Sequence, residues 1–172
     1  MKIILVKNNS PVTEYNNGYG GALYFVFIYE QGEKMSEKLK DDLFLYTVIF
    51  LVGGCLYSTV EIVYRQYTHV SMFFAGGICL VVIALIDTLT PGVRFIFKPI
   101  LCGLAITAVE LIFGLILNVA LGMSVWNYSS EPLNLFGQVC LLFSVLWVII
   151  SIPALLLARL TRLLLVKAQI EQ

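Results

Sequence analysis

Charge is scarce in this sequence: only 13% of its 172 residues are charged, whereas 59% are hydrophobic. Soluble domains use about 25% charged residues, so the composition excludes an ordinary soluble fold. The 11 basic residues are matched by 11 acidic ones. A nucleic-acid binder needs an excess of positive charge. We therefore expect a membrane protein with the lipid bilayer as its solvent and no nucleic-acid partner.

The residue sets of enzymes and metal proteins are also lacking. His69 is the single histidine, and no two cysteines form a CxxC pair. No Ser/His/Asp or Cys/His constellation can be assembled, and no GxxxxGK[ST] phosphate-binding motif occurs. We expect no catalytic residue, metal site or cofactor, and no ATP hydrolysis by this chain itself. We interpret the four cysteines as small buried apolar residues, namely Cys55, Cys79, Cys102 and Cys140.

Long hydrophobic runs take the place of those motifs. About 20 apolar residues are needed to cross a hydrocarbon core of roughly 30 Å, and every backbone polar group in lipid must be paired within its own segment. Four runs qualify and make an all-α, four-helix polytopic membrane protein the predicted fold. The predicted spans are Leu43–Tyr64, Met72–Leu89, Pro99–Leu121 and Leu135–Ala158.

The predicted domain organisation is a single membrane domain over residues 43–165, with a polar N-terminal extension before it and a cytoplasmic tail over residues 166–172. The extension, residues 1–42, contains an apolar patch of only eight residues, which is too short to span. It also lacks the long apolar core of a cleaved signal peptide. Met35 opens a charged segment before the first span, so either residues 1–34 are translated or Met35 is the true start.

Basic residues are distributed unequally between the two sides of the predicted bundle. Because Lys and Arg in short flanks are retained in the cytoplasm, we expect both termini there and the loops 65–71 and 122–134 outside. The outer side holds only Arg65. The inner side holds Lys34, Lys38, Lys40, Arg94, Lys98, Arg159, Arg162 and Lys167.

Glu110 lies at the middle of the third predicted span, where an ionisable group costs at least about 2.5 to 3.5 kcal/mol. It therefore needs a polar partner or a water-filled cavity. One interpretation is a protonated side chain that links helices by a hydrogen bond to a Thr or Asn. The other is an ion or proton site along a transport path. Helical spacing places it on one small and polar face, formed by Gly103, Thr107, Glu110, Gly114 and Asn118.

Glu61 and Arg65 form a second candidate site, at the outer end of the first span. Their (i, i+4) spacing suits an ion pair on one helix face. A local ion pair is the simpler interpretation, and the rim of a binding cleft lined by nearby aromatic residues is the alternative. Asp87 lies two residues from the inner end of the second span, where we expect a solvated carboxylate.

The loop between the third and fourth spans has a composition unlike that of a flexible linker. Trp126 and Tyr128 are residues that anchor at headgroup depth, Asn127 favours turns, and Pro132 fixes a bend. We expect this loop to fold against the outer membrane face, either as a structural lid or as a binding surface.

Pro153 lies inside the fourth predicted span. Its ring nitrogen cannot donate the hydrogen bond that Ile149 would otherwise accept, so we expect a kink there or a repair by Ser151. A fit to the bundle is the favoured role, with gating as the alternative.

Several of these residues together resemble the ABC-transporter permease family called type IV, which is found in Firmicutes. The resemblance covers about residues 43–165, and Asn127 stands where the family usually has an acid. The matching residues are Gly53-Gly54, Tyr57-Ser58, Glu61, Arg65, Thr68-His69, Ser71-Met72, Gly76-Gly77, Glu110, Gly114, Asn118, Gly122, Val125 to Ser129, Pro132, Asn134 and Gly137 to Cys140.

This resemblance implies a permease subunit in the bacterial cytoplasmic membrane, energised by a separate ATP-binding subunit. The inner loop 90–98 is short for a coupling helix, and four helices make a narrow path. A homodimer or a partner permease would then be required, joined through the small-residue faces. Two alternatives remain open, namely a small proton-coupled exporter that uses Glu110 and a structural membrane subunit that transports nothing.

Overall fold

A computed structural model describes the backbone of residues 20–170 and the side chains of residues 28–168. The predicted start at Met35 concerns residues 1–34, of which residues 1–19 lie outside the described part. The elements, in chain order, are α1 (Gly20–Arg65), α2 (Val70–Leu89), the 3-10 helix η1 (Phe95–Phe97), α3 (Lys98–Gly114), the π-helix η2 (Leu115–Ala120), β1 (Asn134–Leu135), β2 (Val139–Cys140) and α4 (Leu141–Ile170).

The predicted four-helix membrane architecture is confirmed. The described residues contain four helices long and apolar enough to cross a membrane, over Ile28–Arg65, Val70–Leu89, Phe95–Ala120 and Leu141–Ala168. The side of the membrane on which each end lies stays a prediction.

The chain divides into two units, Met1–Asp42 and Leu43–Gln172. The described part of the first unit is helical from Gly20 onward, whereas the sequence predicted helix only from Leu43. Residues 30–42 contain no Pro and carry an ion pair of Glu30 with Lys34, whose N–O distance is 2.8 Å. Helix-forming residues with such (i, i+4) pairs explain why α1 begins earlier than hydropathy indicated.

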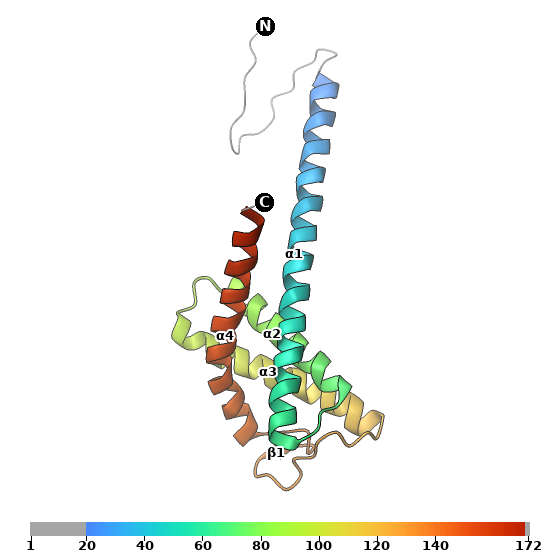
Figure 1. The fold of residues 1–172 in the computed structure, drawn as a ribbon, viewed down its shortest axis with the longest axis vertical. Coiled ribbons are helices and arrows are strands. Elements are labelled where there is room, and N and C mark those ends of the chain that lie inside the picture. Colours follow the sequence, from blue (N-terminus) through green and yellow to red (C-terminus); the bar gives the residue numbers. More distant parts are fainter. Residues whose placement is uncertain (1–19, 171–172) are drawn as a thin grey trace. The chain divides into compact units, whose positions relative to one another are not determined.

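In the second unit α2, α3 and α4 pack on one another, and the 121–140 segment lies beside the C-terminal end of α1 (Figure 1). A buried core joins all four helices of this unit, made of Ile49, Leu80, Ile83, Ala84, Cys102, Ile106, Leu155 and Ala158. Cys102 and Cys140 are buried as predicted, but Cys55 is exposed and that prediction was wrong for it. Exposure costs nothing there, since an apolar side chain of a spanning helix can face lipid.

Glycines let α1 approach α2 closely. A Cβ on Gly76 of α2 would lie 2.3 Å from the Cβ of Tyr57, and one on Gly53 of α1 would lie 2.7 Å from the carbonyl oxygen of Gly76. On α3, a Cβ on Gly103 would lie 2.3 Å from a methyl carbon of Val148 on α4. These glycine faces are therefore occupied within one chain, which removes them as the seam that the sequence suggested for a homodimer.

The fourth helix begins at Leu141, six residues after the predicted start at Leu135. The preceding residues form an antiparallel hairpin in which Asn134 pairs with Cys140 and Leu135 with Val139. Phe136 and Gly137 at its turn have φ values of 54° and 67°, which no α-helix accepts. At its other end α4 continues through Ile170, so most of the segment predicted as a tail is helical.

Candidate functional site

The carboxylate of Glu110 is held by two neutral donors from two different parts of the chain. Trp147 of α4 donates its indole N–H to Oε2 over 2.7 Å, and the Tyr128 hydroxyl of the loop donates to Oε1 over 3.1 Å. Glu110 is half-buried, and both of its carboxylate oxygens have a hydrogen-bond donor. The partners described for Glu110 are thus a Tyr and a Trp rather than the expected Thr or Asn of a neighbouring helix. Thr107, on the same helix as Glu110, donates to the Gly103 carbonyl over 2.9 Å.

Tyr128 ties this carboxylate to the loop. Its ring stacks on Phe143 of α4 with 4.7 Å between centroids, and its backbone N–H donates to the Gly137 carbonyl over 2.8 Å. Burial raises the pKa of the Tyr128 phenol, and the negative charge of Glu110 raises it further. The phenol therefore keeps its proton at neutral pH and remains a donor to Glu110.

Asn118 fastens the start of the loop, and it does so from the π-helix η2 that ends the third span. Its amide nitrogen donates to the Trp126 carbonyl over 3.0 Å and to Oε1 of Gln138 over 2.8 Å, and its amide oxygen accepts from Val125 N–H over 2.6 Å. A π turn changes the direction of side chains relative to a continued α-helix, and such turns often mark functional sites.

Gln138 completes this arrangement from the hairpin. It is 7% exposed, its carbonyl accepts from the Trp126 indole N–H over 2.8 Å, and its side-chain nitrogen donates to the Phe136 carbonyl over 3.0 Å. It packs on Gly114, where a Cβ would lie 2.7 Å from Oε1 of Gln138. We call Asn118, Trp126 and Gln138 the loop network.

The pair predicted between Glu61 and Arg65 is present, with an N–O distance of 2.9 Å. Glu61 also accepts from the Thr68 hydroxyl, and Arg65 donates to the Tyr67 hydroxyl over 2.6 Å and to the Val125 carbonyl over 3.1 Å. The pair is thus more than a local contact, since it joins the α1–α2 loop to the α3–α4 loop.

Asn127 contacts only its own turn among the bonds described for it. Its Oδ1 accepts from Ser129 N–H over 2.9 Å and from the Ser129 hydroxyl over 2.6 Å. A Cβ on Gly137 would lie 3.1 Å from this oxygen. Of the eight predicted site residues, Asn127 and Thr107 are therefore bonded within their own segments, and the other six join different segments.

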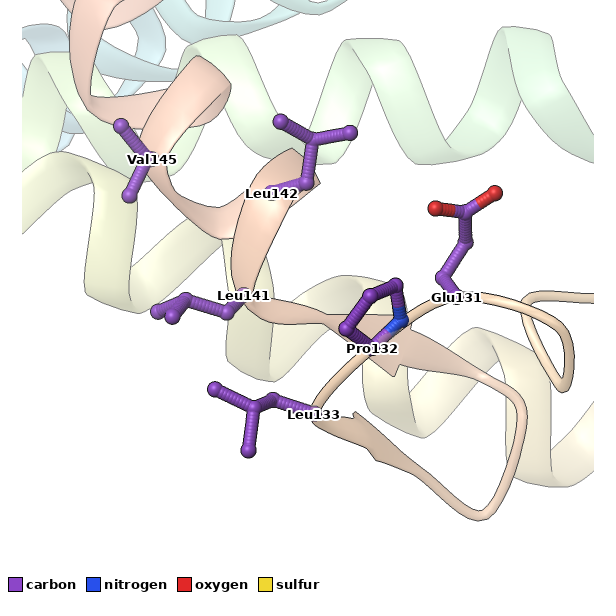
Figure 2. Close-up of a pocket in the computed structure, with 6 residues that line it drawn as sticks. All are labelled: Glu131, Pro132, Leu133, Leu141, Leu142 and Val145. Atoms are coloured by element: carbon purple, nitrogen blue, oxygen red, sulfur yellow. The ribbon is translucent and has the colours of Figure 1, made fainter.

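An open pocket of about 480 Å³ lies on the outside of the hairpin rather than at Glu110. Figure 2 shows its lining side chains around the start of α4, which are Glu131, Pro132, Leu133, Leu141, Leu142 and Val145. The lining is almost wholly apolar and includes none of the predicted site residues. This pocket therefore does not support a binding site for a polar solute.

The prediction that Asp87 has a solvated carboxylate was wrong. Its side chain is only 9% exposed and is paired with two cations. Lys98 at the start of α3 lies 2.6 Å away and is itself almost fully buried. Arg159 of α4 donates to both carboxylate oxygens, over 2.8 and 2.6 Å. Arg162 donates to the Ala84 carbonyl over 3.3 Å and to the Thr88 hydroxyl over 2.6 Å. We call Asp87, Lys98, Arg159 and Arg162 the Asp87 cluster.

Sequence reasoning missed Trp147, Gln138 and the partners of Asp87. A usable signal existed for Trp147, since a buried indole N–H needs an acceptor and Glu110 is the central acid of the spans. No comparable signal existed for Asp87 and Arg159, which are 72 residues apart in sequence.

A family model described as "Putative ABC-transporter type IV" matches residues 43–168. The match covers well over half of the chain and all four predicted spans. The chain belongs to this family. Membership in the type IV ABC-transporter family, together with the four apolar helices, makes it a multi-pass protein of the bacterial membrane and a transporter-type component. No curated protein and no solved structure matches it significantly.

Proposed function

We propose that this type IV chain is a permease subunit that moves a solute across the bacterial cytoplasmic membrane, driven by a separate ATP-binding subunit. The family match over the whole four-helix unit is the observation that carries the proposal. A separate ATPase is needed because the sequence contains no GxxxxGK[ST] motif. The proposal includes a source in Firmicutes, both termini in the cytoplasm, and no chemical catalysis by the chain.

Glu110, Tyr128 and the loop network would act in this proposal as the closed outer end of the path. The loop is hydrogen-bonded to α1 through Arg65, to η2 through Asn118 and to α3 through Glu110. Its Tyr128 ring also stacks on Phe143 of α4. Opening the path on that side would require these bonds to break together. A homodimer would widen the path, and its interface would lie outside the glycine faces already filled within the chain.

Co-purification from the native membrane is the direct test of the ATPase partnership. A tagged chain should recover an ATP-binding subunit in stoichiometric amount, and a vesicle containing both should take up or release solute only with ATP. Recovery of the chain in active vesicles with no ATPase would contradict the proposal.

A proton-coupled exporter is the second candidate, and the position of Glu110 favours it. A carboxyl group in the middle of a span that is held by Trp147 and Tyr128 could lose those donors when it binds a proton or a cationic solute. Dye efflux that collapses with a protonophore and in Glu110→Gln, but not in the matched exposed variant Glu37→Gln, would support this candidate over the ATP-driven one.

A structural subunit that transports nothing is the third reading. Among the described residues, every buried side-chain nitrogen or oxygen has a hydrogen-bond partner. Polar side chains that only hold helices together are expected to be paired in this way. This reading would gain support if Glu110→Gln left every transport measurement unchanged in the native membrane.

A further inference from the structure

Positive charge exceeds negative charge around the Asp87 cluster. Residues 84–98 and 155–168 together contain one acidic residue, Asp87. Its charge is already matched by Lys98 and Arg159. Arg162 donates only to neutral oxygens, and the exposed side chain of Arg94 has no bond among the described residues. The surface therefore presents guanidinium groups that no carboxylate neutralises.

These arginines lie among side chains that face lipid. On α4 the next turns after Arg159 expose Leu160, Leu163 and Leu164 by 53%, 68% and 59%. In η1, directly after Arg94, Ile96 is 73% exposed. Apolar side chains this exposed belong in the bilayer, so the arginines between them lie at the boundary of hydrocarbon and headgroups rather than out in the aqueous phase.

Two of the three guanidinium groups, those of Arg159 and Arg162, are also fixed in position. Arg159 is held by both oxygens of Asp87, and its Cζ lies 4.9 Å from the centre of the Phe95 ring. Arg162 is held against the last turn of α2 through a single nitrogen, Nη2, which leaves its other N–H groups available. Planar guanidinium groups bind phosphate oxygens in pairs, so an ordered set of them favours a phosphate ligand.

We propose that this surface, formed by Arg94, Arg159 and Arg162, binds the phosphate headgroup of an anionic phospholipid. Its charge is complementary to that of such a lipid, and clusters of Lys and Arg beside spanning helices bind anionic headgroups. A soluble acidic protein fits less well, because the exposed leucines beside the arginines would have to leave the bilayer with them. The lipid would bridge α4 and the loop before α3, and so strengthen a junction that Asp87 already makes.

Native mass spectrometry of the full chain in detergent tests this with short-chain phosphatidylglycerol and with phosphatidylcholine of the same chain length. The wild-type chain should bind phosphatidylglycerol at least about tenfold more tightly than phosphatidylcholine. Arg94→Gln/Arg162→Gln should lower that preference to about twofold or less. The double variant keeps Asp87, Lys98 and Arg159, so its fold should persist, and its unfolding temperature checks this.

Lys38→Gln/Lys40→Gln is the matched control, since it removes two positive charges from exposed positions of α1 and should leave the preference unchanged. Equal binding of the two lipids, or a preference that survives in the arginine variant, would overturn the proposal. So would millimolar inorganic phosphate that displaces phosphatidylglycerol completely, because the site would then recognise free phosphate. Loss of a co-purifying soluble protein in the arginine variant, with lipid preference intact, would assign the surface to that protein instead.

Discussion

Where η2 meets the 121–140 loop, the side chains that join the elements are neutral, whereas where α2 meets α3 and α4 they are charged. Asn118, Trp126 and Gln138 bond to backbone groups and to one another, while Asp87 is bonded to Lys98 and Arg159. A neutral hydrogen bond contributes about 1 kcal/mol, and removing one member of a buried ion pair costs about 3 to 5 kcal/mol. Deleting one side chain of the loop network is therefore expected to cost less than deleting Asp87 at the charged end.

The largest effect is expected at the charged end. Asp87→Asn removes the negative charge and leaves the buried Lys98 without a counter-ion. We expect the free energy of unfolding to fall by about 3 kcal/mol, seen as a lower unfolding temperature in detergent. The lost pairing with Arg159 contributes less to this change than the lost pairing with Lys98, because the Arg159 side chain is 41% exposed and its charge is only partly desolvated. Asp42→Asn, at an exposed position, is the control, and equal losses in both variants would contradict the comparison.

A steric change should produce the next largest effect, at the loop end. Gly114→Ala places a Cβ 2.7 Å from Oε1 of Gln138, which must move away and weaken its bond to Asn118. We expect a loss of about 2 kcal/mol, within the range for overpacking. Gly92→Ala meets no atom within 4 Å and should change stability by less than about 0.5 kcal/mol. An unchanged unfolding temperature for Gly114→Ala would show that Gln138 can move away from residue 114 at no cost, which would contradict this prediction.

The bonds of Glu110 combine features of both ends, since an acidic side chain accepts hydrogen bonds from two neutral donors. Trp147→Phe keeps a ring beside Tyr57 but removes the N–H that bonds Oε2 of Glu110. We expect a loss of about 1.5 kcal/mol, the value for a hydrogen bond to a charged group. A double-mutant cycle with Glu110→Gln should give a coupling energy of about 1 kcal/mol. A coupling energy near zero would mean that this bond contributes nothing to stability.

The smallest effect is expected from pH at the loop end. The folded-state pKa of Tyr128 is raised above its unfolded value of about 10. Its contribution to stability is therefore fully present below pH 10 and is lost as pH rises through the folded-state pKa. Unfolding temperatures measured from pH 7 to 11 should fall less steeply above pH 10 in Tyr128→Phe than in the wild type. Tyr64→Phe, at an 82% exposed position, should follow the wild-type curve.

The spans and the importance of Glu110 could be predicted because they depend on local properties, namely run length, depth and helical spacing. The π-helix η2 and the hairpin could not, because η2 continues an apolar run and strands of two residues are too short to show alternation. The environment of Asp87 depends on which helices are neighbours. A position near a helix end favours a solvated acid, and only the packing of α2 against α3 and α4 brings Lys98 and Arg159 to it.

Pro153 lies in α4 between Trp147, which bonds Glu110, and Arg159, which bonds Asp87. The expected repair by Ser151 is absent, because its hydroxyl donates to the Trp147 carbonyl over 2.7 Å rather than to Ile149. An α-helix with all of its backbone hydrogen bonds would transmit a rotation at one end directly to the other end. Because Pro153 removes one backbone hydrogen bond near the midpoint of α4, the helix can bend there when the bonds of the loop network break. Its C-terminal half stays bonded to Asp87 through Arg159.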